Sequence, residues 1–461
     1  MKKKVVALVL GATAALALAS CSGKAKPNFI CPDEFDTTQQ ITIKFWHTMS
    51  KTQLQPLLDE AIEEFHEFYP NITVEHEQVG GYDEVRDQII TNMGTHDYPN
   101  LAYCYPDHVA IYNEAEITVS LDDVIGNSKF GLGGSEIKFE GPKQEDYYQK
   151  FFEEGKKYED GLTYTMPFLK STEALFYNKD FFAQNNLTVP TTWDEMWEVC
   201  AKIKEIDPQS TPLGYDSESN LFITLAETYG YDYTKNNRFG FNNEGMRGLM
   251  KTFKENFDKG YFTSQKIYGS YTNELMTDIT QTSRAYMCIG STAGANYQAN
   301  ANGAFETGVA QIPHATGKAA KAISQGPSLV LFKDENPQAV LATWLFVQYL
   351  NTPSVQAKFA LGSGYLPVNK KATELEPYQQ FLASAAGNKA GIAALATKVA
   401  LAQEANYYTS EVFIGSAYAR DEVGSLVSTI MQDLTINSGN IDSKISEYFK
   451  TAIANCEYQA G

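Results

Sequence analysis

Short stretches of alternating apolar and polar residues recur along this chain and are separated by stretches with helical spacing. Residues 41–46, ITIKFW, alternate in this way and predict a first strand. Residues 53–69 then place apolar side chains on one helical face, namely Leu54, Leu57, Leu58, Ile62, Phe65 and Phe68. Pro70 and Asn71 end that helix, and residues 72–74 begin a second strand. The order of strand, helix and strand predicts an α/β fold.

The same two patterns continue toward the C-terminus. Further strands are predicted at 99–103, 165–168, 174–177, 283–290, 308–313 and within 323–332. Further helices are predicted at 83–93, 181–184, 193–206, 221–229, 244–257, 271–282 and 337–350, and in the C-terminal tail. The helix at 337–350 has a strongly amphipathic pattern and ends at Asn351 to Pro353. The chain contains no internal repeat.

Residues 165–195, TMPFLKSTEALFYNKDFFAQNNLTVPTTWDE, link two long regions that both have the α/β pattern. Asn178 and Asp180 supply cap chemistry for the short helix at 181–184. Thr192 begins the next helix, and Glu195 three residues later completes a capping box. Each flanking region is large enough for its own core, so we predict that the chain passes here from one lobe to another.

The length and composition support two globular lobes. At 461 residues the chain is too long for one ordinary core, and 43% hydrophobic with 20% charged residues excludes a disordered chain. The net charge of −19 argues against nucleic acid as a partner. It does not exclude an anionic small ligand, because local hydrogen-bond donors decide that.

The first 21 residues have the pattern of an export signal. Three lysines at 2–4 precede an apolar run at 5–18, which is too short for a transmembrane helix. Residues 18–21, LASC, resemble a bacterial lipobox, which implies removal of residues 1–20 as a lipoprotein signal peptide and a diacylglycerol on Cys21. The alternative is a simple cleavage site beside an incidental cysteine. We expect an exported protein, anchored by lipid to the cell membrane and facing the outside or the periplasm.

Between the signal and the first strand, residues 21–40 are polar and contain Pro27 and Pro32, which predicts a flexible tether. Such a tether would let the globular body stand off the membrane. No later stretch has about 18 consecutive apolar residues, so the lipid would be the only membrane attachment.

The string at 165–195 resembles the first interlobe crossing of the extracellular solute-binding proteins (family 1) of bacterial ABC importers, with its ordered P, ST, YNKD and TW-x-E elements. FWHTMS at 45–50 and GYLPV at 364–368 resemble other segments of that family, above all of its sugar- and glycerol-3-phosphate-binding lipoproteins. The resemblance implies a two-lobed, periplasmic-binding-protein-like fold, with a sheet flanked by helices in each lobe and a ligand cleft between the lobes. Lobe 1 would contain 41–168 and 313–361, and lobe 2 would contain 169–312 and 362–461.

Loops at the ends of the predicted strands carry candidate ligand-binding residues: His47, Tyr82, Asp107, Ser171, Ser291, Gly326 and Tyr365. The resemblance implies that the tyrosines and serines of this set hydrogen-bond the ligand. Asp107 stands where the family has a ligand-binding glutamate and is one methylene shorter. Gly326 would let the backbone approach the ligand closely. Each residue could instead be a satisfied polar group of a loop or of the core.

A phosphate ligand needs hydrogen-bond donors, and here the chain departs from the family. The glycerol-3-phosphate binders hold the phosphate with an arginine in an LRLGN segment, and residues 412–416, VFIGS, place Phe413 at that position. Arg420 is nearby but out of register. We therefore expect a neutral carbohydrate, with Phe413 either stacked on a sugar face or in the core.

The resemblance implies a substrate-binding lipoprotein that captures a mono- or oligosaccharide by lobe closure and delivers it to ABC permease subunits in the membrane. It implies a monomer without cofactor, metal or catalytic residues, and the six histidines have no metal-binding spacing. One alternative is a glycerol-3-phosphate- or glycerophosphodiester-binding protein of the same family. Another is a lipid-anchored carbohydrate-active enzyme, for which only Asp107 is favourably placed. A third is a sensor partner of a membrane receptor kinase.

The cysteines beyond Cys21 divide into two groups. Cys104, Cys200 and Cys288 lie in apolar runs and are predicted to be core residues. Cys31 and Cys456 lie in polar surroundings near the two ends of the chain, and export would place them in an oxidising compartment. The sequence leaves open whether these two form a disulfide.

Overall fold

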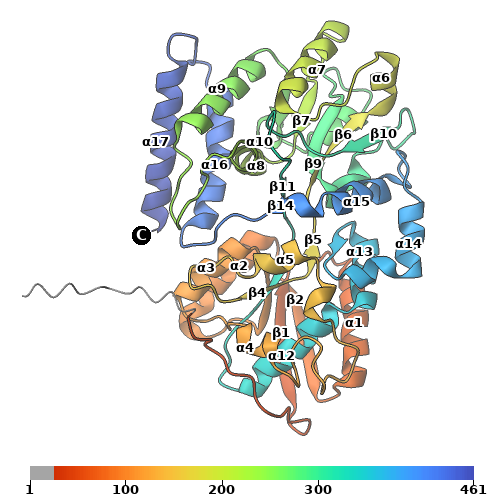
Figure 1. The fold of residues 1–461 in the computed structure, drawn as a ribbon, viewed down its shortest axis with the longest axis vertical. Helices are drawn as coiled ribbons and strands as arrows, with labels where there is room; N and C mark the ends of the chain where they lie inside the picture. The colour runs from red at the N-terminus through yellow and green to blue at the C-terminus, as the bar shows by residue number, and fades with distance from the viewer. Residues whose placement is uncertain (1–24, 461) are drawn as a thin grey trace, which may run out of the picture.

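Two open five-stranded sheets, each flanked by helices, form the body of the protein (Figure 1). The structure is a computed structural model that describes residues 25–460. The predicted signal peptide at 1–20 and the predicted lipidation site Cys21 therefore lie outside the described residues. The two helix-flanked sheets confirm the α/β class predicted from the hydrophobic pattern.

The first sheet has the strand order β2-β1-β3-β12-β4. Its strands are β1 (Ile41–His47), β2 (Ile72–Gln78), β3 (Leu101–Cys104), β4 (Thr165–Pro167) and β12 (Ser328–Leu331). Strand β1 is parallel to β2 and β3, whereas β12 is antiparallel to β3 and β4. Because β12 comes from much later in the chain than its neighbours, the chain must return to this sheet after building the second one.

The second sheet has the strand order β10-β6-β9-β7-β8. Its strands are β6 (Glu173–Asn178), β7 (Leu213–Tyr215), β8 (Phe262–Ser264), β9 (Met287–Ser291) and β10 (Thr307–Ala310). Strand β6 is antiparallel to β9 and β10, and β7 is parallel to β8 and β9. The chain thus leaves the first sheet after β4 and enters the second at β6, within the stretch predicted for the crossing.

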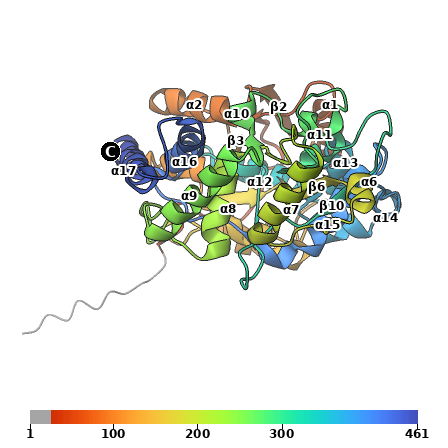
Figure 2. The same ribbon diagram turned by 90° about the horizontal axis from the view of Figure 1, so that it is seen from above.

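Helices cover both sheets (Figures 1 and 2). Those beside the first sheet are α1 (Gln55–Phe68), α2 (Tyr82–Asn92), α3 (Pro106–Glu114), α4 (Asp122–Gly126), α5 (Gln149–Glu154), α12 (Pro337–Leu350), α13 (Pro353–Ser363) and α14 (Glu376–Ala383). Those beside the second are α6 (Lys179–Gln184), α7 (Trp193–Ile206), α8 (Glu218–Tyr229), α9 (Glu244–Asp258), α10 (Gln265–Tyr268), α11 (Asn273–Thr277), α15 (Ile392–Ala402), α16 (Ser416–Gln432) and α17 (Ile441–Ala460).

Two short ladders lie between the sheets (Figure 1). Strand β5 (Leu169–Lys170) pairs with β13 (Leu366–Pro367), and β11 (Ala322–Ile323) pairs with β14 (Tyr407–Tyr408). Each ladder joins segments that are far apart in the sequence and that run between the two sheets. The residue boundaries of the two lobes stay a prediction.

The caps predicted at Asn178 and Thr192 are confirmed, but Asp180 is not a cap: it lies in the first turn of α6, and its Oδ2 accepts from Glu306 N at 2.8 Å. The side chain of Asn178 accepts a hydrogen bond from Phe181 N at 2.9 Å and begins α6. Thr192 and Glu195 form the predicted capping box at the start of α7, with Glu195 Oε2 accepting from Thr192 N at 3.2 Å. These local hydrogen bonds hold the entry into the second lobe.

Helix α12 differs from its predicted amphipathic character, because it is buried on all sides from Ala339 to Leu350. It contacts strands β1 and β12 as well as helices α1 and α13. Trp344 Nε1 donates to Phe130 O at 2.8 Å, which satisfies the one polar atom of that side chain. A helix that is apolar all round belongs in the interior, and α12 is the central helix of the first core.

Two predicted elements of the second lobe are shorter in the structure. The helix expected at 271–282 is confined to α11, and the strand expected at 283–290 begins only at Met287 in β9. The connecting residues contain Asp278, whose side chain accepts hydrogen bonds from Thr280 and Gln281 in a turn. These local bonds compete with helical ones and end α11 early.

The described part of the predicted tether, residues 25–40, packs against the first lobe and is not a free linker. Asn28 N donates to Ser120 Oγ at 2.7 Å, and Cys31 N donates to Asp123 Oδ2 at 2.8 Å. The Phe35 ring packs edge-on against Tyr69 with centroids 5.7 Å apart. Apolar side chains among the polar ones give this segment a surface on which to order.

Cys31 and Cys456 do not form a disulfide in this structure. Both thiols are free and buried, Cys31 in the core of the first lobe and Cys456 in that of the second. A disulfide requires Cα atoms within about 7 Å of each other. Because the two cysteines lie in separate cores, the pairing that the sequence left open is not formed. Cys104, Cys200 and Cys288 are core residues, as predicted.

Across residues 25–460, no helix combines the length and the apolar character needed to cross a membrane.

Replacing Leu345 with alanine tests the central position of α12. Leu345 is fully buried in the first core, so Leu345→Ala should lower the free energy of unfolding by about 2–5 kcal/mol. The matched control is Leu434→Ala, because Leu434 is 93% exposed and the same change should stay within about 0.5 kcal/mol. Chemical denaturation followed by circular dichroism measures both. Equal losses in the two variants would contradict the assignment of α12 to the core.

Candidate functional site

Three cavities lie where the two lobes face each other, and Tyr105 and Arg420 line all of them. Their volumes are about 780, 280 and 70 Å³. Tyr105 follows strand β3 and begins α3 of the first lobe. Arg420 lies in the first turns of α16, whose N-terminal end reaches α3 (Figure 1). The two side chains therefore approach from opposite lobes and form the centre of the candidate site.

The large cavity is lined mainly by polar and aromatic side chains from both lobes. Its lining residues are Tyr105, Glu173, Asp216, Ser217, Asn220, Gln265, Tyr271, Asn273, Glu274, Ser291, Ala293, Gly294, Tyr297, Gln298, Gln325, Tyr365 and Arg420. Three carboxylates face one guanidinium, and four tyrosines add ring faces as well as hydroxyls. Tyr271 and Tyr297 are 59% and 71% exposed, so they stand at the open rim. Such a surface can bind hydroxyl groups and cover the apolar face of a ring.

Glu173, at the start of β6, is the most deeply buried carboxylate of the large cavity, with 1% of its surface exposed. Its Oε2 accepts from Tyr215 Oη at 2.7 Å, and its Oε1 accepts from Asn220 Nδ2 at 2.9 Å. Asn220 Oδ1 in turn accepts from the guanidinium of Arg420. Burial raises the pKa of Glu173 to about 7, although the hydrogen bonds from Tyr215 and Asn220 and the charge of Arg420 act in the opposite direction.

Asp216 is held by a separate set of hydrogen bonds on the same wall. Its Oδ1 accepts from Thr272 N at 2.7 Å and from Thr272 Oγ1 at 2.6 Å, and its Oδ2 accepts from Gln298 Nε2 at 3.4 Å. Burial raises the pKa of Asp216 above its usual value. Thr272 therefore fixes Asp216 in position, and the Oδ2 side is held by Gln298 and by Cys288, whose Sγ donates to it at 3.6 Å.

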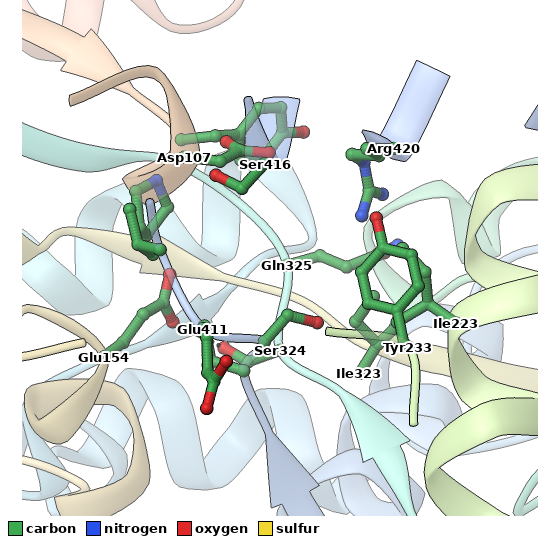
Figure 3. A pocket seen from close by; sticks show the side chains of 15 residues that line it. Asp107, Glu154, Ile223, Tyr233, Ile323, Ser324, Gln325, Glu411, Ser416 and Arg420 are labelled. Carbon is green, nitrogen blue, oxygen red and sulfur yellow. Dashed lines mark hydrogen bonds between the residues drawn. The ribbon is translucent and has the colours of Figure 1, made fainter. Parts of the chain in front are cut away.

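The two smaller cavities lie on the other sides of Arg420. The 280 Å³ cavity is lined by Tyr82, Asp107, His108 and Asp421 among others, and Asp107 Oδ1 and His108 Nδ1 are buried without a hydrogen-bond partner. The smallest cavity lies beside the crossing segments, where Figure 3 shows the Arg420 guanidinium next to the hydroxyl of Tyr233, with Ser324 and Glu411 nearby. Unpaired acceptors in these walls could bind ligand hydroxyls.

Four of the residues predicted from the sequence line these cavities. Tyr82 and Asp107 line the 280 Å³ cavity, and Ser291 and Tyr365 line the large one. The rings of Tyr82 and Tyr105 lie 4.4 Å apart, and burial followed by the neighbouring Tyr365 hydroxyl raises the pKa of Tyr82 well above 10. Direct contact between these side chains and a ligand stays a prediction.

Gly326 occupies a crossing segment where only glycine fits. Its φ of +98° lies in the left-handed region, and a Cβ there would stand 2.4 Å from Leu169 O and 3.2 Å from Tyr365 Cε1. The absence of a side chain lets the second crossing pack against the first and places Tyr365 against it. Glycine is therefore required at position 326 by the packing of the crossing itself. A close approach of the ligand to this backbone stays a prediction.

Besides Gly326, three predicted site residues lie outside the lining of the three cavities, namely Ser171, Phe413 and His47. Ser171 is buried in the crossing, where its backbone N and O pair with Gln325 O and N. Phe413 is 7% exposed and packs against Phe239, with ring centroids 5.4 Å apart. Its place in the second lobe agrees with the core alternative that the sequence left open, so Phe413 does not supply a stacking surface in this structure.

His47 is fully buried, and both of its ring nitrogens are engaged. Nδ1 accepts from Met49 N at 3.1 Å, which leaves Nε2 to donate to His76 Nδ1 at 2.9 Å. His76 Nε2 then donates to Asp59 Oδ1 at 2.8 Å. Burial, followed by the charge of His76, lowers the pKa of His47 to about 3. This chain of hydrogen bonds stabilises the end of β1 and leaves His47 no free atom for a ligand.

The residues that sequence reasoning missed are Arg420, Asn220, Glu173 and Asp216. Glu173 could have been noticed as a carboxylate at the start of an otherwise apolar strand, which is unusual for a buried position. Arg420 was set aside because it lies seven residues after Phe413, the position of the family's arginine. Phe413 lies before the first residue of α16 and Arg420 lies within that helix, and only the placement of α16 brings Arg420 to the cavities.

Comparison with known proteins agrees with this architecture. Residues 60–386 match the family described as bacterial extracellular solute-binding protein. A protein of Brucella abortus described as a binding protein is 26% identical over 294 residues, which cover 62% of this chain and 66% of its own length. The sn-glycerol-3-phosphate-binding periplasmic protein UgpB of Rhizobium meliloti is 24% identical over 362 residues, covering 74% of this chain and 78% of that protein.

Two solved structures share the fold at low sequence identity. The sugar-binding protein MalE of Xanthomonas citri superposes with a TM-score of 0.70 at 17% identity, over 90% of this chain and 98% of that one. UgpB of Mycobacterium tuberculosis, solved in complex with glycerophosphocholine, gives a TM-score of 0.69 at 20% identity, over 90% and 98% of the two chains. Both likenesses confirm the predicted two-lobed fold.

Substitution of Gly326 should destabilise the crossing. Gly326→Ala forces a Cβ against Leu169 O in addition to the strain of a left-handed backbone, so it should cost more than the roughly 1–2 kcal/mol of the backbone term alone. Gly317→Ala is the matched control, because Gly317 also has a positive φ but has open space around its Cβ position. Urea unfolding of both variants gives the comparison. An equal cost for the two substitutions would show that the close packing at Gly326 is not important.

Buried His47 should make the protein less stable in acid. Above pH 6.5 its imidazole is neutral in both states, and below that pH the unfolded chain takes up a proton that the folded protein, with a pKa of about 3, does not. Stability should therefore fall as the pH decreases from 6.5 toward 3, by at most about 1.4 kcal/mol per pH unit from this residue. In His47→Gln the melting temperature should decline less steeply between about pH 6 and 4 than in the wild type. His66→Gln, which changes an exposed histidine of α1, should keep the wild-type slope.

Proposed function

This chain belongs to the bacterial extracellular solute-binding proteins, and on that premise we propose that it captures a carbohydrate for an ABC importer. The family and the relatives support a solute-binding protein of the sugar or glycerophosphate type. The observation that supports a carbohydrate is the lining of the 780 Å³ cavity, in which carboxylates, amides and hydroxyls surround the ligand space together with four tyrosine rings. Neutral hydroxyl groups satisfy all of these partners without bringing in a second charge.

The balance of charge in the large cavity favours a neutral ligand. Glu173, Asp216 and Glu274 line it, and Arg420 is the one basic side chain among the described residues that line it. A phosphate monoester carries a charge of about −1.5 to −2 near neutral pH and would meet more carboxylates than cations. A sugar would accept hydrogen bonds from Arg420 and Asn220 and donate to the carboxylates.

Lobe closure is the proposed mechanism of capture. Tyr105 and Tyr365 adjoin the first sheet, whereas Asn220, Ser291 and Arg420 belong to the second lobe. A ligand that contacts both sets favours the closed state, because those contacts cannot all form when the lobes are apart. The closed protein would then deliver the ligand to permease subunits in the membrane. We further propose a monomer that is exported and anchored through a lipid on Cys21.

A glycerol-3-phosphate- or glycerophosphodiester-binding protein is the second candidate, and Arg420 is the observation that favours it. The guanidinium faces all three cavities, and within residues 25–460 no carboxylate lies close enough to pair with it. A planar fork of donors at the centre of a site is well suited to a phosphate. Arg420 thus supplies to the cavities the kind of donor that Phe413 lacks, so the absence of an arginine at position 413 does not count against a phosphate ligand.

Catalysis is not part of the proposal. The relatives and structural neighbours named above are described as binding proteins. Glu154, one of the acids lining the smallest cavity, is paired with Lys170 at 2.8 Å and accepts from Ser324 Oγ at 2.8 Å, so it is held in a structural role. A carbohydrate-active enzyme and a sensor subunit remain outcomes of the test below.

A ligand screen by thermal shift and calorimetry tests the function. The panel contains mono- and oligosaccharides, polyols, glycerol 3-phosphate and glycerophosphodiesters, and a ligand at about 100 times its Kd should stabilise the protein by about 2.7 kcal/mol. We expect a neutral sugar to bind and to be recovered unchanged. Binding of glycerol phosphates alone would overturn the carbohydrate proposal in favour of the second candidate. Cleavage of the sugar would identify an enzyme.

The role of Arg420 separates the two candidates. If the ligand is a neutral sugar, Arg420→Met should weaken binding by roughly tenfold to a hundredfold, as for the loss of one charge-assisted hydrogen bond. If the ligand is a phosphate ester, the same change should weaken binding by more than about a thousandfold, because paired charge-assisted bonds and a compensating charge are lost together. Arg238→Met, at an exposed arginine outside the three cavities, is the control and should leave the affinity unchanged.

A further inference from the structure

A chain of hydrogen bonds links the only cation of the large cavity's described lining to its most buried carboxylate. Arg420 donates to Asn220 Oδ1, Asn220 Nδ2 donates to Glu173 Oε1 at 2.9 Å, and Tyr215 Oη donates to Glu173 Oε2 at 2.7 Å. Glu173 is therefore a carboxylate linked to Arg420 through one amide. Asp107 of the first lobe and Asp421 on α16 are the other carboxylates whose charges interact with Arg420. Glu173 and Arg420 both line the same cavity as the proposed ligand.

The members of this chain are fixed by the second lobe. Glu173 is the first residue of β6, Tyr215 ends β7 and Asn220 lies in the first turn of α8. Helix α8 packs along α16, which carries Arg420. Glu173, Asn220 and Tyr215 are all buried, so the negative end of the chain and the amide are held in place by packing, whereas Arg420 is half-buried and reaches the cavity.

Both oxygens of Glu173 accept hydrogen bonds, which favours the ionised carboxylate, and burial opposes ionisation. The other groups near it are Asp216, whose charge disfavours ionisation, and Tyr408, which donates to or accepts from Thr224. Gln403 Nε2 contacts the backbone oxygen of Glu173 at 3.4 Å. The net result is a pKa of about 7, so Glu173 changes its charge near neutral pH.

We propose that Glu173, acting through Asn220, is a specificity-determining residue that makes the cavity prefer neutral ligands over anionic ones. When Glu173 is ionised, it offsets the charge of Arg420, and an anion brought to Arg420 is repelled by the carboxylate on the far side of Asn220. When Glu173 is protonated, its negative charge is lost from the large cavity while Asp107 remains on the other side of Arg420, so the cavity accepts an anion more readily. Binding of an anion should therefore take up a proton at Glu173, whereas binding of a neutral sugar should not.

This inference deepens the proposed function and rests on it. The anionic probe is glycerophosphoglycerol, a phosphodiester with one negative charge that does not titrate near neutral pH. Calorimetry of the full-length wild-type protein should show weaker binding of this probe as the pH rises above 7, approaching tenfold per pH unit. In Glu173→Gln the affinity should be independent of pH and at least tenfold higher than in the wild type at pH 8. If Glu173 had only a structural role, the Glu173→Gln variant would keep the pH dependence of the wild type.

The matched control is Glu274→Gln, which removes a carboxylate from the lining of the same cavity. Glu274 is exposed and accepts from Ser270 Oγ at 2.7 Å, with no link to Asn220 or Arg420. Its variant should keep the wild-type dependence on pH. A second measurement uses the wild type alone and does not depend on the folding of a variant. In two buffers with different heats of ionisation at pH 7.5, binding of the probe should take up about three-quarters of a proton, because that is the fraction of Glu173 that is ionised before binding.

Several results would overturn the proposal. These are a pH-independent affinity in the wild type, no proton uptake, or a probe affinity in Glu173→Gln that does not exceed that of the wild type. Failure of both proteins to bind the probe at any pH has the same consequence, because Glu173→Gln should expose a binding site for anions. Neutral sugars measured in parallel report separately on the proposed function, so loss of sugar binding and loss of this pH effect are distinguishable.

Discussion

The fold depends on a buried ion pair where the chain crosses between its two sheets. Lys170 in β5 donates to Glu154 Oε1 at 2.8 Å, to Ser328 Oγ at 2.9 Å and to Gly326 O at 3.2 Å. Neither charged side chain is more than 3% exposed. Two segments that are far apart in the sequence are thus tied at one ammonium group. A buried lysine is tolerated only when its charge and all of its donors are satisfied, so each partner depends on the others.

This arrangement explains why the crossing can carry a binding site on its surface. The segment between β11 and β12, whose Gly326 O accepts from Lys170, also contains Gln325, and Gln325 lines the large cavity. Tyr365 lies against Gly326 because no Cβ intervenes. The rigid centre therefore positions the two lobes relative to one another, while the side chains that face the cavities come from the loops at the strand ends.

The protein is acidic overall, and Arg420 is the one basic side chain among the described residues that line the large cavity. Arg420 is held by an amide, and the carboxylate that balances it is one step further away. A direct ion pair would have consumed the donors that a ligand needs. Separating the two charges through Asn220 keeps the guanidinium available and still avoids an uncompensated buried charge.

The sequence alone determined a large part of this protein. Alternating and helical periodicity depend on neighbouring residues, and they predicted the α/β class, the crossing at 165–195 and the caps at Asn178 and Thr192, all of which the structure confirms. The ordered motifs of the crossing pointed to the correct family. Local patterns also placed Tyr82, Asp107, Ser291, Gly326 and Tyr365 at strand ends, where the structure gathers them.

Tertiary structure decided the rest, because it depends on residues far apart in the chain. The periodicity of α12 could not show that other elements cover its second face. The polar composition of residues 25–40 could not show that the Phe35 ring packs against Tyr69. Phe413 lies before α16 begins at Ser416, whereas Arg420 lies within the helix, and the placement of α16 brings Arg420 and not Phe413 to the cavities. The link from Arg420 to Glu173 joins four elements of the second lobe, and only their packing brings those residues within hydrogen-bond distance.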